Sequence, residues 1–178
     1  MSASQVAETM ARAVQSEISS AQVIQIPMAD GGEGTVDALV AALNGNVLGF
    51  AFLVLGADLV PGAKFVEKMT GLKDWIHGAD WVLTGEGRSD SQTLYGKLPR
   101  YVAEIARDAG TEAVLISGSF GPGSEKLLSY FSACFSIVDR PAALEECMER
   151  AEILLYECTR NIVRSIVRAQ NQNLQMSN

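Results

Sequence analysis

Apolar positions along the chain recur at two spacings, one typical of amphipathic helices and one typical of short buried strands. The helical spacing predicts helices over 3–18, 36–43, 61–71, 99–108, 125–130 and 141–168. The strand-like runs cover 23–26, 80–84, 113–117 and 134–138. Because strands and helices alternate, the sequence predicts an α/β fold, with a mostly parallel open sheet flanked by helices in one Rossmann-like or flavodoxin-like domain.

The stretch 47–56 fits two structures. It follows a turn signal at 44–46 and is almost continuously apolar, a pattern that a buried helix and a buried strand share at this length. Both alternatives stay open. The run is far shorter than the ~20 residues of a membrane span, so no membrane partner is expected.

Glycine-rich turns fall where predicted strands end and helices begin, at 29–35, 84–97 and 117–123. In open parallel sheets, ligands bind outside the carboxyl ends of the strands. We therefore expect these three loops to face one crevice, although 117–123 is equally consistent with an ordinary strand-to-helix turn.

Loop 29–35 combines glycines that permit a close backbone approach with two acids, Asp30 and Glu33. Carboxylates repel a bare phosphate but suit Mg²⁺, a sugar-acid hydroxyl or a proton-accepting role. The structural alternative is that Asp30 caps the following helix and Glu33 lies in its first turn. We favour function for Asp30, and give the structural reading at least equal weight for Glu33.

Loop 84–97 holds the richest chemistry. Arg88 could bind a carboxylate or phosphate in bidentate fashion, and Lys97 could act as a point charge on phosphate. Glu86 and Asp90 could hold Mg²⁺. The alternative is an internal network of salt bridges that shapes a long loop. We favour function, although neither loop contains a Walker A or a GxGxxG motif.

Composition narrows the classes of partner and the compartment. A formal net charge of -7 argues against a nucleic-acid partner. The three cysteines, Cys134, Cys147 and Cys158, form no CxxC pair and are expected to be reduced thiols. The amino-terminal residues lack the apolar core of a signal peptide, so we expect a cytoplasmic protein.

Two segments, 23–39 and 78–97, closely resemble the glycerate kinase family that includes the bacterial glycerate 2-kinases. The resemblance implies ATP-dependent phosphorylation of glycerate to a phosphoglycerate, with ATP and Mg²⁺ as cofactors. It also implies a longer, two-domain enzyme. We expect this chain, 1–178, to form one α/β domain assembled from the family's amino-terminal part (1–46) and carboxyl-terminal part (47–178), without the inserted domain and the first strand.

On this resemblance, roles can be assigned to residues of both loops. Asp30 and Arg88 are the expected catalytic residues, and Glu86 and Asp90 the expected metal ligands. The residues expected to bind substrate or phosphate are Gly31, Gly32, Glu33, Gly34, Thr35, Gly85, Gly87, Gln92, Thr93 and Lys97.

Two other functions stay open. The chain could be a non-catalytic remnant or excised domain that binds glycerate or nucleotide without turnover. A flavodoxin-like FMN binder is a weak third reading. Without the second domain that the resemblance implies, the apolar face that would pack on it invites a homo-oligomer.

Overall fold

The computed structural model describes residues 1–28, 67, 70–95 and 97–176. Its α-helices are α1 (Ala3–Glu17), α4 (Leu72–His77), α5 (Leu98–Ala109), α6 (Leu144–Glu149) and α7 (Ala151–Met176). Its strands are β1 (Trp81–Ser89), β2 (Glu112–Phe120) and β3 (Ala133–Ser136). Two 3₁₀ helices, η1 (Ser91–Leu94) and η2 (Ser124–Ser129), follow the first two strands. None of the helices among these residues is long and apolar enough to cross a membrane.

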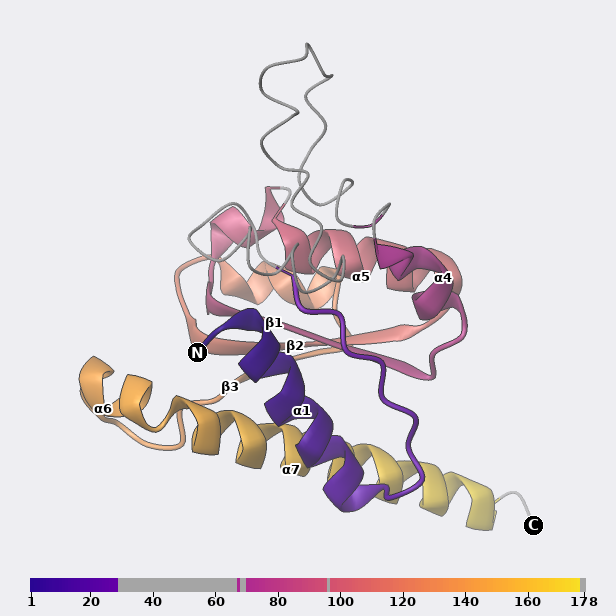
Figure 1. The fold of residues 1–178 in the computed structure, drawn as a ribbon. Coiled ribbons are helices and arrows are strands. Elements are labelled where there is room, and N and C mark those ends of the chain that lie inside the picture. Colours follow the sequence, from indigo (N-terminus) through magenta and orange to yellow (C-terminus); the bar gives the residue numbers. More distant parts are fainter. Residues whose placement is uncertain (29–66, 68–69, 96, 177–178) are drawn as a thin grey trace.

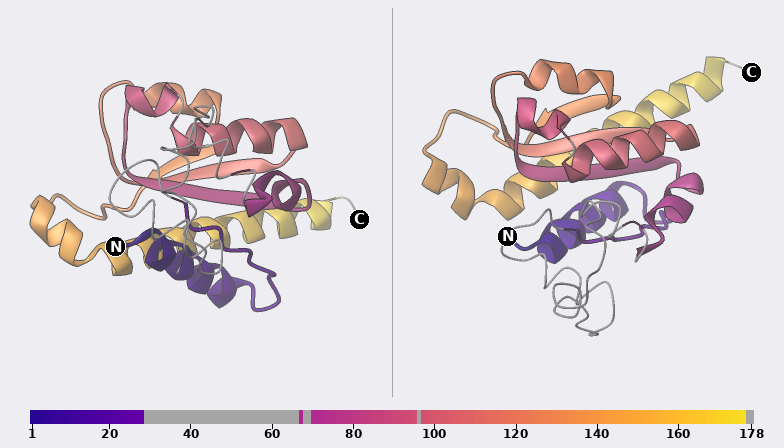
Figure 2. Two further views of the ribbon diagram at one scale, coloured as in Figure 1. Left: turned by 45° about the horizontal axis from the view of Figure 1, so that its top comes forward. Right: turned by 90° about the horizontal axis from the view of Figure 1, so that it is seen from above.

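The three strands form one parallel sheet in the order β1-β2-β3. Helices α1 and α7 lie on one face of the sheet, and α4 and α5 lie on the other (Figures 1 and 2). This arrangement confirms the predicted α/β domain with an open parallel sheet flanked by helices.

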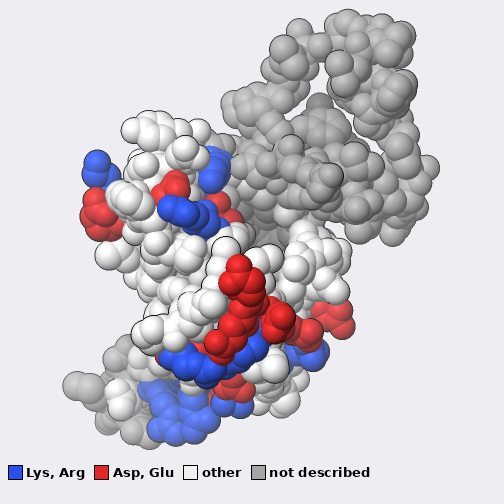
Figure 3. Space-filling view, turned by 90° about the vertical axis from the view of Figure 1, so that its left-hand side faces the viewer, with Lys and Arg blue, Asp and Glu red and all other residues white. Residues whose placement is uncertain are grey.

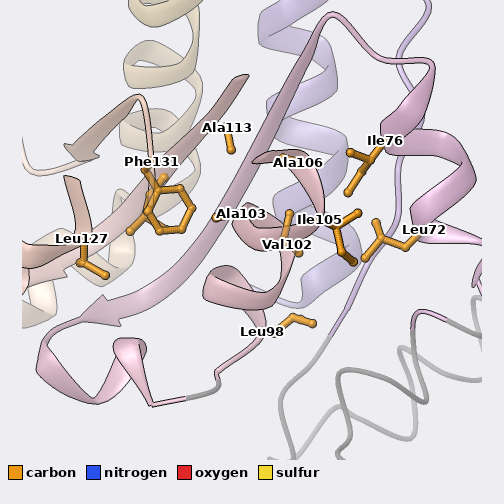
Figure 4. Packing of buried hydrophobic residues seen from close by; sticks show 11 residues of the cluster. Leu72, Ile76, Leu98, Val102, Ala103, Ile105, Ala106, Ala113, Leu127 and Phe131 are labelled. Carbon is orange, nitrogen blue, oxygen red and sulfur yellow. The ribbon is translucent and has the colours of Figure 1, made fainter. Parts of the chain in front are cut away.

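Strand β2 is the middle strand of the sheet, and both of its faces are buried. Ala113 and Leu115 point into a cluster formed mainly by α4 and α5, part of which Figure 4 shows. Val114 and Ile116 belong to a second cluster with residues of α1 and α7. A strand covered on both faces reads as a continuous apolar run rather than an alternating one, which is why 113–117 was recognisable in the sequence.

Several predicted boundaries differ from the structure. The expected strand at 23–26 is wrong, since the segment is irregular, although its Ile26 packs against the cluster around α4 and α5. A strand exists only through pairing, and within the described sheet β1 pairs with β2 alone. The helix predicted at 141–168 divides at Arg150 into α6 and α7.

Strands β1 and β2 run further than expected, through Ser89 and Phe120, into stretches that read as glycine-rich turns. The helix expected at 125–130 is the 3₁₀ helix η2. The predictions for 36–43 and 47–56, and most of 61–71, lie outside the described residues.

Candidate functional site

The carboxyl ends of β1 and β2 approach closely because glycines line their contact. A Cβ on Gly85 would lie 2.4 Å from the carbonyl oxygen of Ile116, and one on Gly118 would lie 2.4 Å from that of Gly87. Neither distance is compatible with a side chain. Gly85, Gly87 and Arg88, which were expected in a loop, are therefore residues of an extended β1.

The turns that follow the two strands are fastened to each other. The N–H of Gly121 donates to the carbonyl of Ser89 at 2.8 Å, and the N–H of Ser91 donates to the carbonyl of Pro122 at 3.1 Å. Gly123 adopts a left-handed conformation (φ 83°) beside Ser91. Loops 84–97 and 117–123, predicted to face one crevice, thus meet at the carboxyl edge of the sheet.

Asp90 starts the short helix η1. Its Oδ1 accepts from the N–H of Gln92 at 2.8 Å, and its own N–H donates to Thr93 Oγ1 at 3.2 Å. Oδ2 lies 3.7 Å from Nε of Arg88, whose side chain is 65% exposed. Asp90 thus has a structural role as a helix cap, and Arg88 is held beside it at the surface.

Glu86 is the centre of a polar network. Its Oε1 accepts hydrogen bonds from Ser89 Oγ and Thr93 Oγ1, both at 2.7 Å. Its Oε2 lies 3.7 Å from Nζ of Lys97, the residue that precedes α5. The Glu86 side chain is only 16% exposed, so its charge is met mainly by these three partners.

A serine from β2 extends this network. The parallel register sets Glu86 opposite Ser117, and Ser117 Oγ is hydrogen-bonded to Ser89 Oγ. Because Ser89 uses its proton on Glu86, Ser117 is the donor to Ser89. Ser89, Ser117 and Thr93 are all fully buried. The result is a directed chain of hydroxyls that ends on the Glu86 carboxylate.

The sequence missed part of this site. Ser89 and Ser117 were not among the expected site residues, although each lies in a loop expected to face the crevice, 84–97 or 117–123. Thr93, expected to bind ligand, turns its buried hydroxyl to Glu86 instead. Of the other residues expected in this loop, Gly85, Gly87 and Arg88 belong to β1 and Gln92 to η1. Those of the first loop lie outside the described residues: Asp30, Gly31, Gly32, Glu33, Gly34 and Thr35.

Both signs of charge are present at the site. Each cation is beside an acid, Lys97 beside Glu86 and Arg88 beside Asp90. Figure 3 shows the side of the molecule where the strands end, and basic and acidic side chains intermingle on it. The salt-bridge network foreseen as the structural alternative is therefore present, and it leaves both cations partly exposed.

A metal site is not preassembled in the described part of the chain. No group of three or more His, Cys, Asp or Glu side chains is placed to hold a metal ion there. However, Mg²⁺ in phosphate-binding sites is commonly held by one or two carboxylates together with substrate phosphates and water. Glu86 and Asp90 supply that number of carboxylates, each beside one cation of the loop.

A hollow also lies away from these loops. A groove of about 500 Å³ runs between β3 and α7, at the far edge of the sheet, and contains no residue of 84–97 or 117–123. The charged and polar residues thus lie at the carboxyl ends of β1 and β2, whereas the groove lies beside β3. We assign ligand binding to the charged loops.

Comparison with known proteins gives a consistent result. A model of the glycerate kinase family matches residues 1–48 and 47–167. Glycerate kinase of Halalkalibacterium halodurans is 37% identical over 142 residues, which cover 79% of this chain and 34% of the relative. Glycerate 2-kinase of Escherichia coli is 32% identical over 136 residues, covering 76% of this chain and 34% of the relative.

A crystal structure assigned to a glycerate kinase 2 of Salmonella typhimurium LT2 superposes with a TM-score of 0.51 and 28% identity, covering 76% of this chain and 38% of that one. In each comparison, this chain spans little more than a third of the known protein.

Proposed function

Because the chain belongs to the glycerate kinase family, we propose that it acts in the ATP-dependent phosphorylation of glycerate to a phosphoglycerate. The observation that supports this activity is the cluster of Arg88, Lys97 and Glu86 at the joined carboxyl ends of β1 and β2. Phosphoryl transfer depends mainly on positioning and on charge stabilisation around the phosphates, and this cluster supplies groups for both.

The two cations are suited to bind phosphate because neither makes a close ion pair. Each lies 3.7 Å from its carboxylate, and the Arg88 side chain is 65% exposed. Exposed ion pairs contribute about 0–1 kcal/mol, so a phosphate with its greater charge can draw Arg88 away from Asp90 at little cost. Lys97 also precedes α5, whose amino-terminal N–H groups favour an anion.

Glu86 keeps the site ordered when Lys97 turns to phosphate. The two hydroxyl donors on Oε1 remain in place, so the carboxylate does not become an unsatisfied buried charge. Glu86 and Asp90 are the described carboxylates that would hold Mg²⁺. When bound, that ion would neutralise phosphate charge.

The glycerate end of the reaction is assigned to loop 29–35. Asp30 would accept the proton of the attacking glycerate hydroxyl. At the same time the hydroxyl oxygen would form a bond to the γ-phosphorus of ATP, and ADP would leave. Support for this role comes from the family resemblance of segment 23–39 and from the chemistry of a carboxylate in a glycine-rich turn.

Coupled measurement of ADP release tests the proposal. The purified chain with MgATP should release ADP faster when D-glycerate is added. Lys97→Met should lower glycerate-dependent kcat/KM by about 100-fold, the usual scale for one charged contact in a transition state. Lys126→Met removes an exposed lysine from neighbouring η2 and serves as the matched control, with unchanged rates expected.

A second function is favoured by the internal junction of the match. The family model matches the chain in two segments that meet at 47–48. A non-catalytic domain that binds nucleotide or glycerate is consistent with this. Such a domain would bind a fluorescent ATP analogue, lose that binding on Lys97→Met, and release no ADP.

A further inference from the structure

The helix α6 carries an apolar ridge that nothing in the described structure covers. Leu144 and Met148 lie one turn apart and are each 68% exposed, and no residue of α6 is buried. In Figure 1 the helix projects beyond the sheet, next to the start of α7. A six-residue helix gains little stability on its own, so something else fixes its position.

Ion pairs hold α6 in this projecting position. Arg150 donates to Asp139 at 2.9 Å and lies 3.6 Å from Glu146 of the helix. Arg140 also pairs with Glu146. The hydrogen bond from Arg150 lowers the pKa of Asp139 below its usual range. Ion pairs, rather than apolar packing, therefore hold the ridge at the surface.

An apolar groove lies immediately beside the ridge. It is the hollow of about 500 Å³ between β3 and α7, and Asp139 and Arg150 line it as well as fixing α6. Its exposed apolar residues are Phe135, Val138 and Ile153, with exposed fractions of 39%, 38% and 63%. One face of the molecule therefore presents a ridge and a groove of matching chemistry, side by side.

Charges around the two features are also complementary. Glu145 and Glu149 flank the ridge, are exposed, and pair with no cation among the described residues. On α7, Asn161 and Ser165 line the far end of the groove, and Arg168 follows on the same helical face. Arg168 is exposed and has no acidic partner within the described part of the chain.

We propose that this face binds a second copy of the chain around a two-fold axis, with the α7 helices antiparallel. In that arrangement, each α6 ridge enters the partner's groove, and Glu145 and Glu149 meet the partner's Arg168. A two-fold contact requires a surface that is complementary to itself, and adjacent ridge and groove with opposite charges at their outer ends satisfy that condition. The proposal is independent of whether the chain turns over ATP.

Charge reversal combined with mixing gives a specific test by sedimentation velocity of the full chain. Wild type should sediment as a dimer. Arg168→Glu alone, and the double variant Glu145→Arg with Glu149→Arg alone, should each associate at least about tenfold more weakly, because like charges then oppose one another at both ends of the contact. An equimolar mixture of the two should form a heterodimer, since every opposed pair is again of opposite sign.

The control is Glu125→Arg, which makes the same change on exposed η2 and should leave wild-type dimerisation unchanged. Circular dichroism checks that all variants are folded. A monomeric wild-type chain would overturn the proposal. Reversal variants that dimerise like wild type, or a mixture that stays monomeric, would also overturn it and would assign any self-association to another surface, such as a sheet edge.

Discussion

Thr93 and Thr159 allow one substitution to be compared in two environments. Both are fully buried. Thr93 Oγ1 donates to the Glu86 carboxylate at 2.7 Å and accepts from the N–H of Asp90 at 3.2 Å. Thr159 Oγ1 is buried without a hydrogen-bond partner in the described structure. Valine replaces threonine with nearly the same shape, so the change removes the hydroxyl and little else.

The expected effects have opposite signs. A hydrogen bond to a charged group contributes about 1.5–3 kcal/mol, so Thr93→Val should lower the free energy of unfolding by about 2–3 kcal/mol once the freed N–H of Asp90 is included. Thr159→Val removes a buried hydroxyl that has already lost its hydration, and should raise the free energy of unfolding by about 1 kcal/mol. Valine and threonine have similar helix propensities, so α7 itself contributes little to the difference.

Urea unfolding monitored by circular dichroism measures both variants. With a slope of about 2 kcal/mol per molar urea, the two midpoints should differ by about 1.5–2 M, with Thr93→Val below wild type and Thr159→Val above it. Equal midpoints, or a lower midpoint for Thr159→Val than for Thr93→Val, would refute the network assigned to Glu86.

Two further predictions concern the sheet and a thiol. Gly85→Ala should destabilise the fold by about 1–3 kcal/mol because its Cβ would meet the carbonyl of Ile116 at 2.4 Å. Gly87→Ala, whose Cβ would meet nothing within 4 Å, should leave the thermal midpoint nearly unchanged, and equal losses would show that β1 and β2 do not approach as described. Burial raises the pKa of Cys134 to about 11. In a variant that lacks Cys147 and Cys158, a thiol reagent should therefore label Cys134 about 200-fold more slowly than free cysteine at pH 8. The labelling rate should increase up to pH 11. Labelling at the rate of free cysteine would contradict that burial.

The sequence predicted those parts of the fold in which local pattern and burial agree. The run 113–117 was recognised because β2 is buried on both faces, and the helix at 99–108 because α5 has one apolar face. The segment 23–26 looks equally strand-like, yet no described strand pairs with it. The extension of β2 through Phe120 was missed because Gly118 reads locally as a turn, whereas here it permits the close approach of β1.

The site shows the same limit. The four charged residues of 84–97 were expected to lie together because they are near in sequence, and the structure brings them into two ion pairs. Ser117 belongs to loop 117–123, which was expected at the same crevice, but its hydrogen bond to Ser89, 28 positions away, depends on the parallel register of β1 and β2. Register depends on how two strands pair, so the pattern of one strand alone does not give it.

The central claim, that this chain transfers phosphate to glycerate, is tested most directly by phosphorus NMR. The purified, folded chain is incubated with MgATP and D-glycerate, and the spectrum is followed with time. We predict a new phosphomonoester resonance that grows in step with ADP and does not form without glycerate. ADP accompanied only by inorganic phosphate, or an unchanged ATP spectrum from a folded sample, would contradict the claim.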